Sequence, residues 1–184
     1  MAGSHEVRGS IPLCSTILYQ ARRLLGLFCF AGGYVMKIAV SACLLGEACR
    51  YDGKSKPCSE VISFLQHHES IPVCPEIMGG LSIPHPPSEI QTLSSDLLVK
   101  DVSGKDTTAF FEKGAQVALK KALEKGVTHA IFKAKSPSCG VDEIYDGTFT
   151  RTLVSGDGVA VRLFKEAGIR VATEDTFKKV FRTS

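Results

Sequence analysis

Three short apolar runs, each followed closely by a cysteine, constrain the fold of this chain more than any other feature. The cysteines concerned are Cys43, Cys74 and Cys139. Short apolar runs bounded by turn residues are typical of strands that are buried in a parallel sheet. In open α/β sheets, the ligand crevice lies beyond the carboxyl ends of the strands. If the three runs join one sheet, we therefore expect the three cysteines to meet at one of its edges.

The apolar pattern alternates between strand and helix signals. Strands are predicted at residues 37–42, 71–73, 96–102, 128–132 and 169–171. Helices are predicted at residues 59–68, 107–125, 158–167 and 173–181. Ser59 is the expected N-cap of the first helix, and Gly126 is the expected stop of the second. Residues 75–95 are predicted to be a long loop that leads into an edge or hairpin strand. This alternation predicts an α/β protein, a single-domain, three-layer Rossmann-like fold with a mostly parallel sheet.

Composition narrows the class of protein. The 184 residues are 44% hydrophobic, which suits one ordinary domain with a sizeable core. The formal net charge of +3 is slight and the basic residues are dispersed, so no DNA-binding surface is expected. None of the seven cysteines belongs to a Cys-x-x-Cys pair, which argues against a thioredoxin-type redox site and a zinc ribbon. With no convincing signal peptide, we expect a cytoplasmic protein, in which clustered cysteines usually serve metal binding or catalysis.

The N-terminal stretch differs from the rest of the chain. Residues 24–33 faintly resemble the apolar region of a signal peptide, but they are too few to cross a bilayer. The first predicted strand begins directly after Met36. We therefore expect residues 1–35 to be an N-terminal extension, added upstream or included by the assigned start site, and residues 36–184 to form the α/β domain. No membrane attachment is expected.

Three cysteine thiolates on separate loops can each ligate one iron of a cubane 4Fe-4S cluster. With only three protein ligands, the fourth iron stays open, as one position does in a catalytic zinc site. An open iron suits a soft ligand such as a thiocarbonyl sulfur. The residues alone leave other interpretations open, namely a structural zinc site, thiol redox chemistry, or cysteines that are buried as small apolar side chains.

Six short motifs, in order and almost without gaps, resemble the motif series of the 2-thiouracil desulfurase family. They are residues 41–46 (Ser-Ala-Cys-Leu-Leu-Gly), 49–53 (Cys-Arg-Tyr-Asp-Gly), 74–76 (Cys-Pro-Glu), 79–81 (Gly-Gly-Leu), 136–140 (Ser-Pro-Ser-Cys-Gly) and 144–149 (Ile-Tyr-Asp-Gly-Thr-Phe). The resemblance runs from Met36 to about Val180. It implies a 4Fe-4S cluster and desulfuration of a thiolated nucleobase such as 2-thiouracil, with the open iron accepting the sulfur.

The resemblance also implies which cysteines bind the cluster. The ligands it points to are Cys43, Cys74 and Cys139, because these lie inside the matching motifs. Cys49 is close enough in the sequence to replace one of them. The alternative function is a non-enzymatic module that binds a metal or an iron-sulfur cluster in sulfur trafficking or sensing. Both functions require the cysteines, but only the first releases sulfide from thiouracil.

Desulfuration replaces C=S with C=O, so water must attack the carbon and a nearby group must transfer protons. Glu76 is the expected acid or base, although a helix N-terminus or a loop ion pair would also explain a glutamate there. Ser136 and Ser138 are expected to hydrogen-bond the cluster or the substrate, with simple turn chemistry as the alternative. Asp52 is expected to orient the catalytic base or a neighbouring arginine.

Four further side chains are expected to bind the substrate, namely Arg50, Tyr51, His85 and Lys135. His85 departs from the family pattern, in which an arginine is expected at this place. An arginine grips a carboxylate or phosphate with a fixed pair of donors, and a neutral imidazole does not. The identity of the thiolated substrate is therefore the least constrained part of the prediction.

Overall fold

The computed structural model describes residues 28–30, 33–92 and 97–181. Most of the predicted extension therefore lies outside the described residues, and the division of the chain at residue 35 stays a prediction. Ahead of the main sheet, β1 (Phe28–Phe30) pairs antiparallel with β2 (Gly33–Val35). Within the described part of the chain, no helix is both long enough and apolar enough to span a bilayer.

The centre of the molecule is a parallel sheet of four strands in the order β10-β7-β3-β4. The strands are β3 (Lys37–Ser41), β4 (Glu69–Val73), β7 (His129–Phe132) and β10 (Arg170–Thr173). Ser41 pairs with Val73, and Val40 pairs with Ile131. The carboxyl ends of three neighbouring strands therefore lie at one edge of the sheet, as the sequence predicts.

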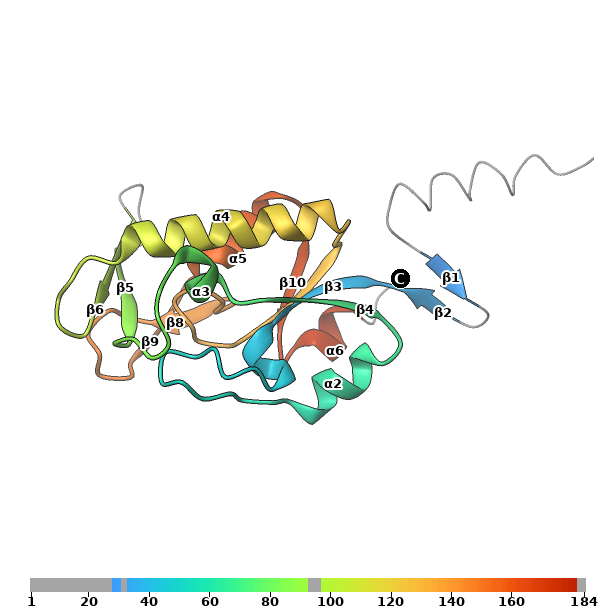
Figure 1. Ribbon diagram of the computed structural model, residues 1–184, viewed down its shortest axis with the longest axis horizontal. Helices are drawn as coiled ribbons and strands as arrows, with labels where there is room; N and C mark the ends of the chain where they lie inside the picture. The colour runs from blue at the N-terminus through green and yellow to red at the C-terminus, as the bar shows by residue number, and fades with distance from the viewer. Residues whose placement is uncertain (1–27, 31–32, 93–96, 182–184) are drawn as a thin grey trace, which may run out of the picture.

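Helices cover both faces of the sheet, and the predicted three-layer α/β fold is confirmed (Figure 1). On one face, Ala39 packs in a core that includes residues of α4 (Thr108–Glu124) and α5 (Val159–Glu166). On the other face, Ile38 packs with α2 (Ser59–Leu65), α6 (Phe177–Val180) and the 3-10 turn η1 (Ala42–Leu45). Neighbouring residues of a strand face opposite sides, so β3 contributes to both cores.

Two antiparallel hairpins lie together at the end of the molecule away from β1 and β2 (Figure 1). One joins β5 (Ser88–Thr92) to β6 (Leu98–Asp101), and the other joins β8 (Glu143–Tyr145) to β9 (Leu153–Ser155). The expected hairpin strand near residues 96–102 is thus confirmed. The prediction of a plain loop at residues 75–95 is wrong, because this stretch also contains α3 (Pro75–Gly79) and β5.

Two predicted helix boundaries are also wrong. The last helix begins only at Phe177, because Thr173 pairs with Phe132 and ends β10. The N-cap of α2 is Cys58 rather than Ser59, and no side chain caps this helix. Gly126 does follow the end of α4 with a φ of +68°, a left-handed conformation that glycine adopts without a steric penalty.

The short helix α3 packs on α4 through two glycines. A Cβ atom added to Gly114 would lie 1.9 Å from the carbonyl oxygen of Pro75, and one added to Gly79 would lie 2.0 Å from that of Phe110. The two backbones therefore approach more closely than any side chain permits. Because α3 begins directly after Cys74, this contact also sets where the cysteine and its neighbours stand.

We expect Gly114→Ala to destabilise the protein by roughly 1–3 kcal/mol, because the new methyl group overpacks the contact with α3. Alanine favours a helix by up to about 1 kcal/mol relative to glycine, and the overlap outweighs this gain. Thermal unfolding measures the effect as a fall in Tm. Gln116→Ala, an exposed change on the same helix, is the control and should move stability by less than about 0.5 kcal/mol. A Gly114→Ala protein as stable as this control would contradict the close contact.

The strand β4 is an edge strand of the four-stranded sheet. It contains Pro72, which has no backbone N–H and is tolerated in sheets at such outer strands. The carbonyl of the same residue accepts a hydrogen bond from Nζ of Lys121 at 2.8 Å. The outward-facing polar groups of Pro72 are thus either missing or already occupied.

Candidate functional site

A cavity of about 1020 Å³ opens where β3, β4 and β7 end. The cysteines that line it are Cys43, Cys49, Cys58, Cys74 and Cys139. Cys43 lies in η1, directly after β3, and Cys74 directly follows β4. Cys139 lies in the loop that follows β7. The expected meeting of the three strand-end cysteines at one edge of the sheet is therefore present, and Cys49 lies among them.

Four of these cysteines interact with one another, namely Cys43, Cys49, Cys74 and Cys139. Sγ of Cys74 donates a hydrogen bond to the carbonyl oxygen of Cys49 at 3.5 Å. A hydrogen bond with the Cys43 side chain raises the pKa of Cys49 to about 11. The Cys49 side chain, followed by burial, raises the pKa of Cys74. Burial raises the pKa of Cys139, and the nearby Cys74 adds to the effect. These raised pKa values favour the protonated form of Cys49, Cys74 and Cys139, so ligation has to displace protons from the thiols that bind.

The donor set fits a cluster better than a single ion. Among the described residues, no three His, Cys, Asp or Glu side chains are grouped closely enough to hold one metal ion. A single zinc needs all its ligands within about 2.3 Å of one point. A cubane cluster holds each cysteine on a different iron, so its ligands stand further apart. Soft sulfur donors from separate strand ends, with a cavity in front of them, match the second arrangement.

Glu76 lines the same cavity from the first turn of α3, two residues after Cys74. Its side chain is 15% exposed. Oγ of Ser136 donates a hydrogen bond to Oε1 of Glu76 at 3.3 Å. The same Oγ accepts hydrogen bonds from the backbone N–H groups of Ser138 at 3.1 Å and Cys139 at 3.2 Å. The carboxylate is thereby connected to the loop that carries the third strand-end cysteine.

His85 contacts the opposite side of the Glu76 carboxylate. Its Nε2 lies 3.1 Å from Oε2 of Glu76, and its Nδ1 lies 2.6 Å from the carbonyl oxygen of Ser82. Only 5% of the imidazole is exposed. The hydrogen bond with Glu76 is the main cause that raises the pKa of His85, and burial opposes it. The loop-ion-pair alternative for Glu76 is thus present in the structure alongside its place in the cavity.

The comparisons with known proteins agree with this geometry. The family model for 2-thiouracil desulfurase matches residues 38–176. The chain belongs to the 2-thiouracil desulfurase family. A curated relative, the uncharacterized protein YbbK of Bacillus subtilis (strain 168), is 35% identical over 149 residues, which cover 78% of this chain and 99% of YbbK. A solved structure, the 4Fe-4S-dependent thiouracil desulfidase TudS, is similar at 40% identity with a TM-score of 0.71 and covers 79% of this chain and 95% of TudS.

The loop that carries Cys139 is held by α5 in this family member. Backbone N–H groups of Gly158 and Ala160 donate to the carbonyls of Gly140 at 2.8 Å and Ser138 at 3.0 Å. A Cβ atom on Gly158 would lie 2.5 Å from the backbone carbon of Ser138. The first turn of α5 therefore satisfies its own backbone donors with the loop and fixes the loop in place.

In this desulfurase-family chain, some of the predicted site residues line the cavity and others do not. Those that line the cavity with the cysteines are Arg50, Tyr51, Glu76, Lys135 and Ser136. Those outside that lining are Asp52, His85 and Ser138. Asp52 accepts a hydrogen bond from Nη2 of Arg50 at 3.2 Å, and Ser138 is buried with no partner for its Oγ among the described residues. The roles of all eight residues stay predictions.

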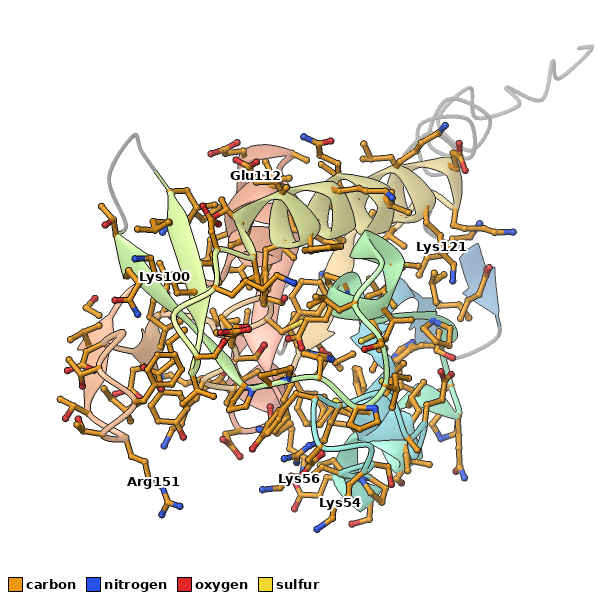
Figure 2. All side chains as sticks on the ribbon, turned by 60° about the vertical axis from the view of Figure 1, so that its left-hand side comes forward. Lys54, Lys56, Lys100, Glu112, Lys121 and Arg151 are labelled. Atoms are coloured by element: carbon orange, nitrogen blue, oxygen red, sulfur yellow. The ribbon has the colours of Figure 1, made fainter. Side chains whose placement is uncertain are left out.

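Residues around the second hairpin line the cavity although they are not among the site residues predicted from the sequence. They include Tyr145, Phe149 and Arg151, together with Glu89 of β5. The backbone N–H of Phe149 donates to Oε2 of the buried Glu89 at 2.9 Å. Figure 2 shows Arg151 pointing away from the body of the molecule at the end of the hairpin. The signal available for Tyr145 and Phe149 was that both belong to the last family motif, residues 144–149.

Lys133 and Glu174, which directly follow β7 and β10, also line the cavity. Their side chains form an ion pair, and Oε2 of Glu174 also accepts a hydrogen bond from the backbone N–H of Ala134 at 2.8 Å. The neighbouring Lys135 adopts a left-handed φ of +66°, which is uncommon for a non-glycine residue. Figure 2 shows Lys54 and Lys56 grouped on the loop after η1, and Lys56 also lines the cavity.

Proposed function

We propose that this chain is a 4Fe-4S-dependent desulfidase of a thiolated nucleobase of the 2-thiouracil type. The observation that carries this proposal is the presence of Cys43, Cys74, Cys139, Glu76 and Ser136 around one cavity at the carboxyl edge of the sheet. Family membership and the similarity to TudS support it. The net reaction exchanges sulfur for oxygen: the thiocarbonyl and one water give a carbonyl and hydrogen sulfide, with no oxidant or reductant.

Cys43, Cys74 and Cys139 would hold the cluster, with Cys49 as the alternative to one of them. When bound, the cluster supplies an iron that no protein side chain ligates, and thus a soft site for sulfur. The proposed cytoplasmic location follows the same chemistry, because thiols that hold iron persist in a reducing compartment. The five cysteines that line the cavity are free thiols.

Glu76 is the proposed general base. Its carboxylate faces the cavity and takes a proton from the water that attacks the thiocarbonyl carbon. Ser136 donates to Oε1 of this carboxylate and so fixes the oxygen that is next to the Cys139 loop. The proton that Glu76 receives is then available for the departing sulfur. This assignment requires a carboxylate in this place, and an amide of the same shape cannot perform it.

The aromatic side chains of the cavity are the proposed platform for the pyrimidine ring. Tyr51, Tyr145 and Phe149 line it, and base–aromatic stacking contributes about 1–3 kcal/mol per base. Arg50 and Lys135 line it as well and supply hydrogen-bond donors for the oxygen of the base. Asp52 has a supporting part in this proposal, because it holds the guanidinium of Arg50.

The experiment that tests the proposed function is anaerobic reconstitution with iron and sulfide, followed by addition of 2-thiouracil. The expected result is loss of the thiocarbonyl absorbance, with one sulfide and one uracil formed for each thiouracil consumed. A cluster-bearing protein that turns over no thiolated base would instead indicate the sulfur trafficking or sensing module. A protein that binds no iron under these conditions would contradict both functions.

A further inference from the structure

The contacts of His85 with Ser82 and Glu76 limit where the hydrogens of its ring can lie. The carbonyl oxygen of Ser82 can only accept a hydrogen bond, so Nδ1 of His85, at 2.6 Å from it, has to carry a proton. Nε2 faces Oε2 of Glu76 at 3.1 Å, and a hydrogen bond there needs one shared proton. An imidazolium with a carboxylate satisfies this requirement, and so does a neutral imidazole with a carboxylic acid. In both cases Oε2 is fixed toward His85.

The second carboxylate oxygen is fixed from the other side. The two lone pairs of the Ser136 hydroxyl are used by the backbone N–H groups of Ser138 and Cys139. Its hydrogen is therefore free to point only at another acceptor, and Oε1 of Glu76 lies 3.3 Å away. The carboxylate is thus held between a histidine and a serine, which leaves it one orientation toward the cavity.

His85 is itself held in place by its own loop. Its backbone N–H donates to the carbonyl of Tyr51 at 2.9 Å, and Oγ of Ser82 donates to the carbonyl of Pro84 at 2.9 Å. The residues that line the large cavity include Glu76 but not His85, which borders a separate, smaller cavity of about 220 Å³. Its Nδ1 contacts Ser82 and its Nε2 contacts Glu76, so the ring can influence the substrate only through Glu76.

We propose that His85 is a positioning residue, which aims the Glu76 carboxylate at the reacting water by donating to Oε2 while Ser136 donates to Oε1. This inference rests on the proposed function of Glu76 as the base. It assigns His85 a different role from the substrate contact that the sequence predicts. Misplacement of a catalytic group by about 1 Å costs on the order of 100-fold in rate, so the orientation of this carboxylate matters directly.

Two matched substitutions separate the two ring nitrogens. The amide nitrogen of His85→Gln reaches the place of Nε2 and can still donate to Glu76, whereas that of His85→Asn reaches the place of Nδ1 and can serve only Ser82. We expect His85→Asn and His85→Ala to lose roughly 100-fold in kcat with KM little changed, and His85→Gln to stay within about threefold of the unmodified enzyme. Iron content and cluster absorbance should be equal in all four proteins.

The outcome that would overturn the proposal is equal loss in His85→Asn and His85→Gln, because a residue that only packs its loop would behave in this way. A loss confined to KM would point back to a substrate contact and would overturn it as well. So would full activity of His85→Asn.

A measurement without turnover completes the test. In the protein labelled with ¹⁵N at histidine, we expect the His85 ring to carry a proton on both Nδ1 and Nε2, and Glu76→Gln to shift its Nε2 signal. Comparison with His85→Gln assigns the signals. A ring with no proton on Nε2 could not donate to Oε2 of Glu76, and it would overturn the proposal even if the variants were unstable. Failure of the unmodified enzyme to desulfurate thiouracil would refute the proposed function, and the ring protonation would still decide the contact.

Discussion

Replacement of Cys43, Cys74 or Cys139 by alanine is expected to abolish both cluster binding and thiouracil desulfuration. The loops that carry Cys74 and Cys139 contain no second cysteine, so neither loop can supply another thiol in place of the one that is removed. The expected iron content falls from about four per chain to well below one. Iron and sulfide analysis, the visible absorbance of the cluster and the rate of sulfide release measure the effect.

Two other cysteines of the same cavity are the controls. Cys58→Ala removes a half-buried thiol at the start of α2 and should leave cluster content and turnover unchanged. Cys49→Ala decides the composition of the ligand set, because Cys49 interacts with both Cys43 and Cys74. If Cys49→Ala loses its iron while one of the three alanine variants keeps it, the assignment of that ligand is wrong.

Glu76→Gln is expected to lower kcat by about 10²- to 10⁴-fold, because the amide keeps the shape of the side chain but cannot take the proton of water. KM and cluster absorbance should change little, since neither the cysteines nor the aromatic lining is altered. Anaerobic steady-state kinetics with 2-thiouracil measures both constants. A smaller fall in kcat is expected for Ser136→Ala, which leaves Glu76 its carboxylate but removes the donor to Oε1.

The matched control is Glu60→Gln. Glu60 also lines the cavity, but it is exposed and pairs with Nζ of Lys178 at 2.7 Å on the outer surface. This substitution removes a carboxylate from the cavity rim without touching the cysteine edge, and it should leave kcat unchanged. A Glu76→Gln enzyme with the kcat of this control would show that another group accepts the proton.

The place where the cysteines meet could be predicted because strand direction decides it. Parallel strands end at the same edge, so an apolar run followed by Cys43, Cys74 or Cys139 is sufficient to place each thiol. The same reasoning applies to Glu76, which follows β4 by three residues. These inferences use only local sequence and the polarity of one sheet, and for that reason they survive errors in individual helix boundaries.

The contacts that orient the site could not be predicted in this way. The meeting of His85 with Glu76 depends on how the loop after α3 folds back, and the sequence between them carries no periodic signal for it. The approach of Gly79 to Gly114 depends on the packing of two helices that are far apart in the sequence. The hairpin residues Phe149 and Glu89 come together from separate β-ribbons. All three features are products of tertiary packing.

The outer edge at Pro72 bears on how this protein behaves when it is concentrated. An exposed strand edge recruits strands from other molecules through its free N–H and C=O groups. In the middle of β4 the donor is missing and the acceptor is already bound to Lys121, so a second chain finds no continuous ladder there. The lateral edge of the sheet at β4 is thereby protected from strand addition by another copy. We therefore expect the protein not to associate through β4 when it is concentrated for loading with iron and sulfide.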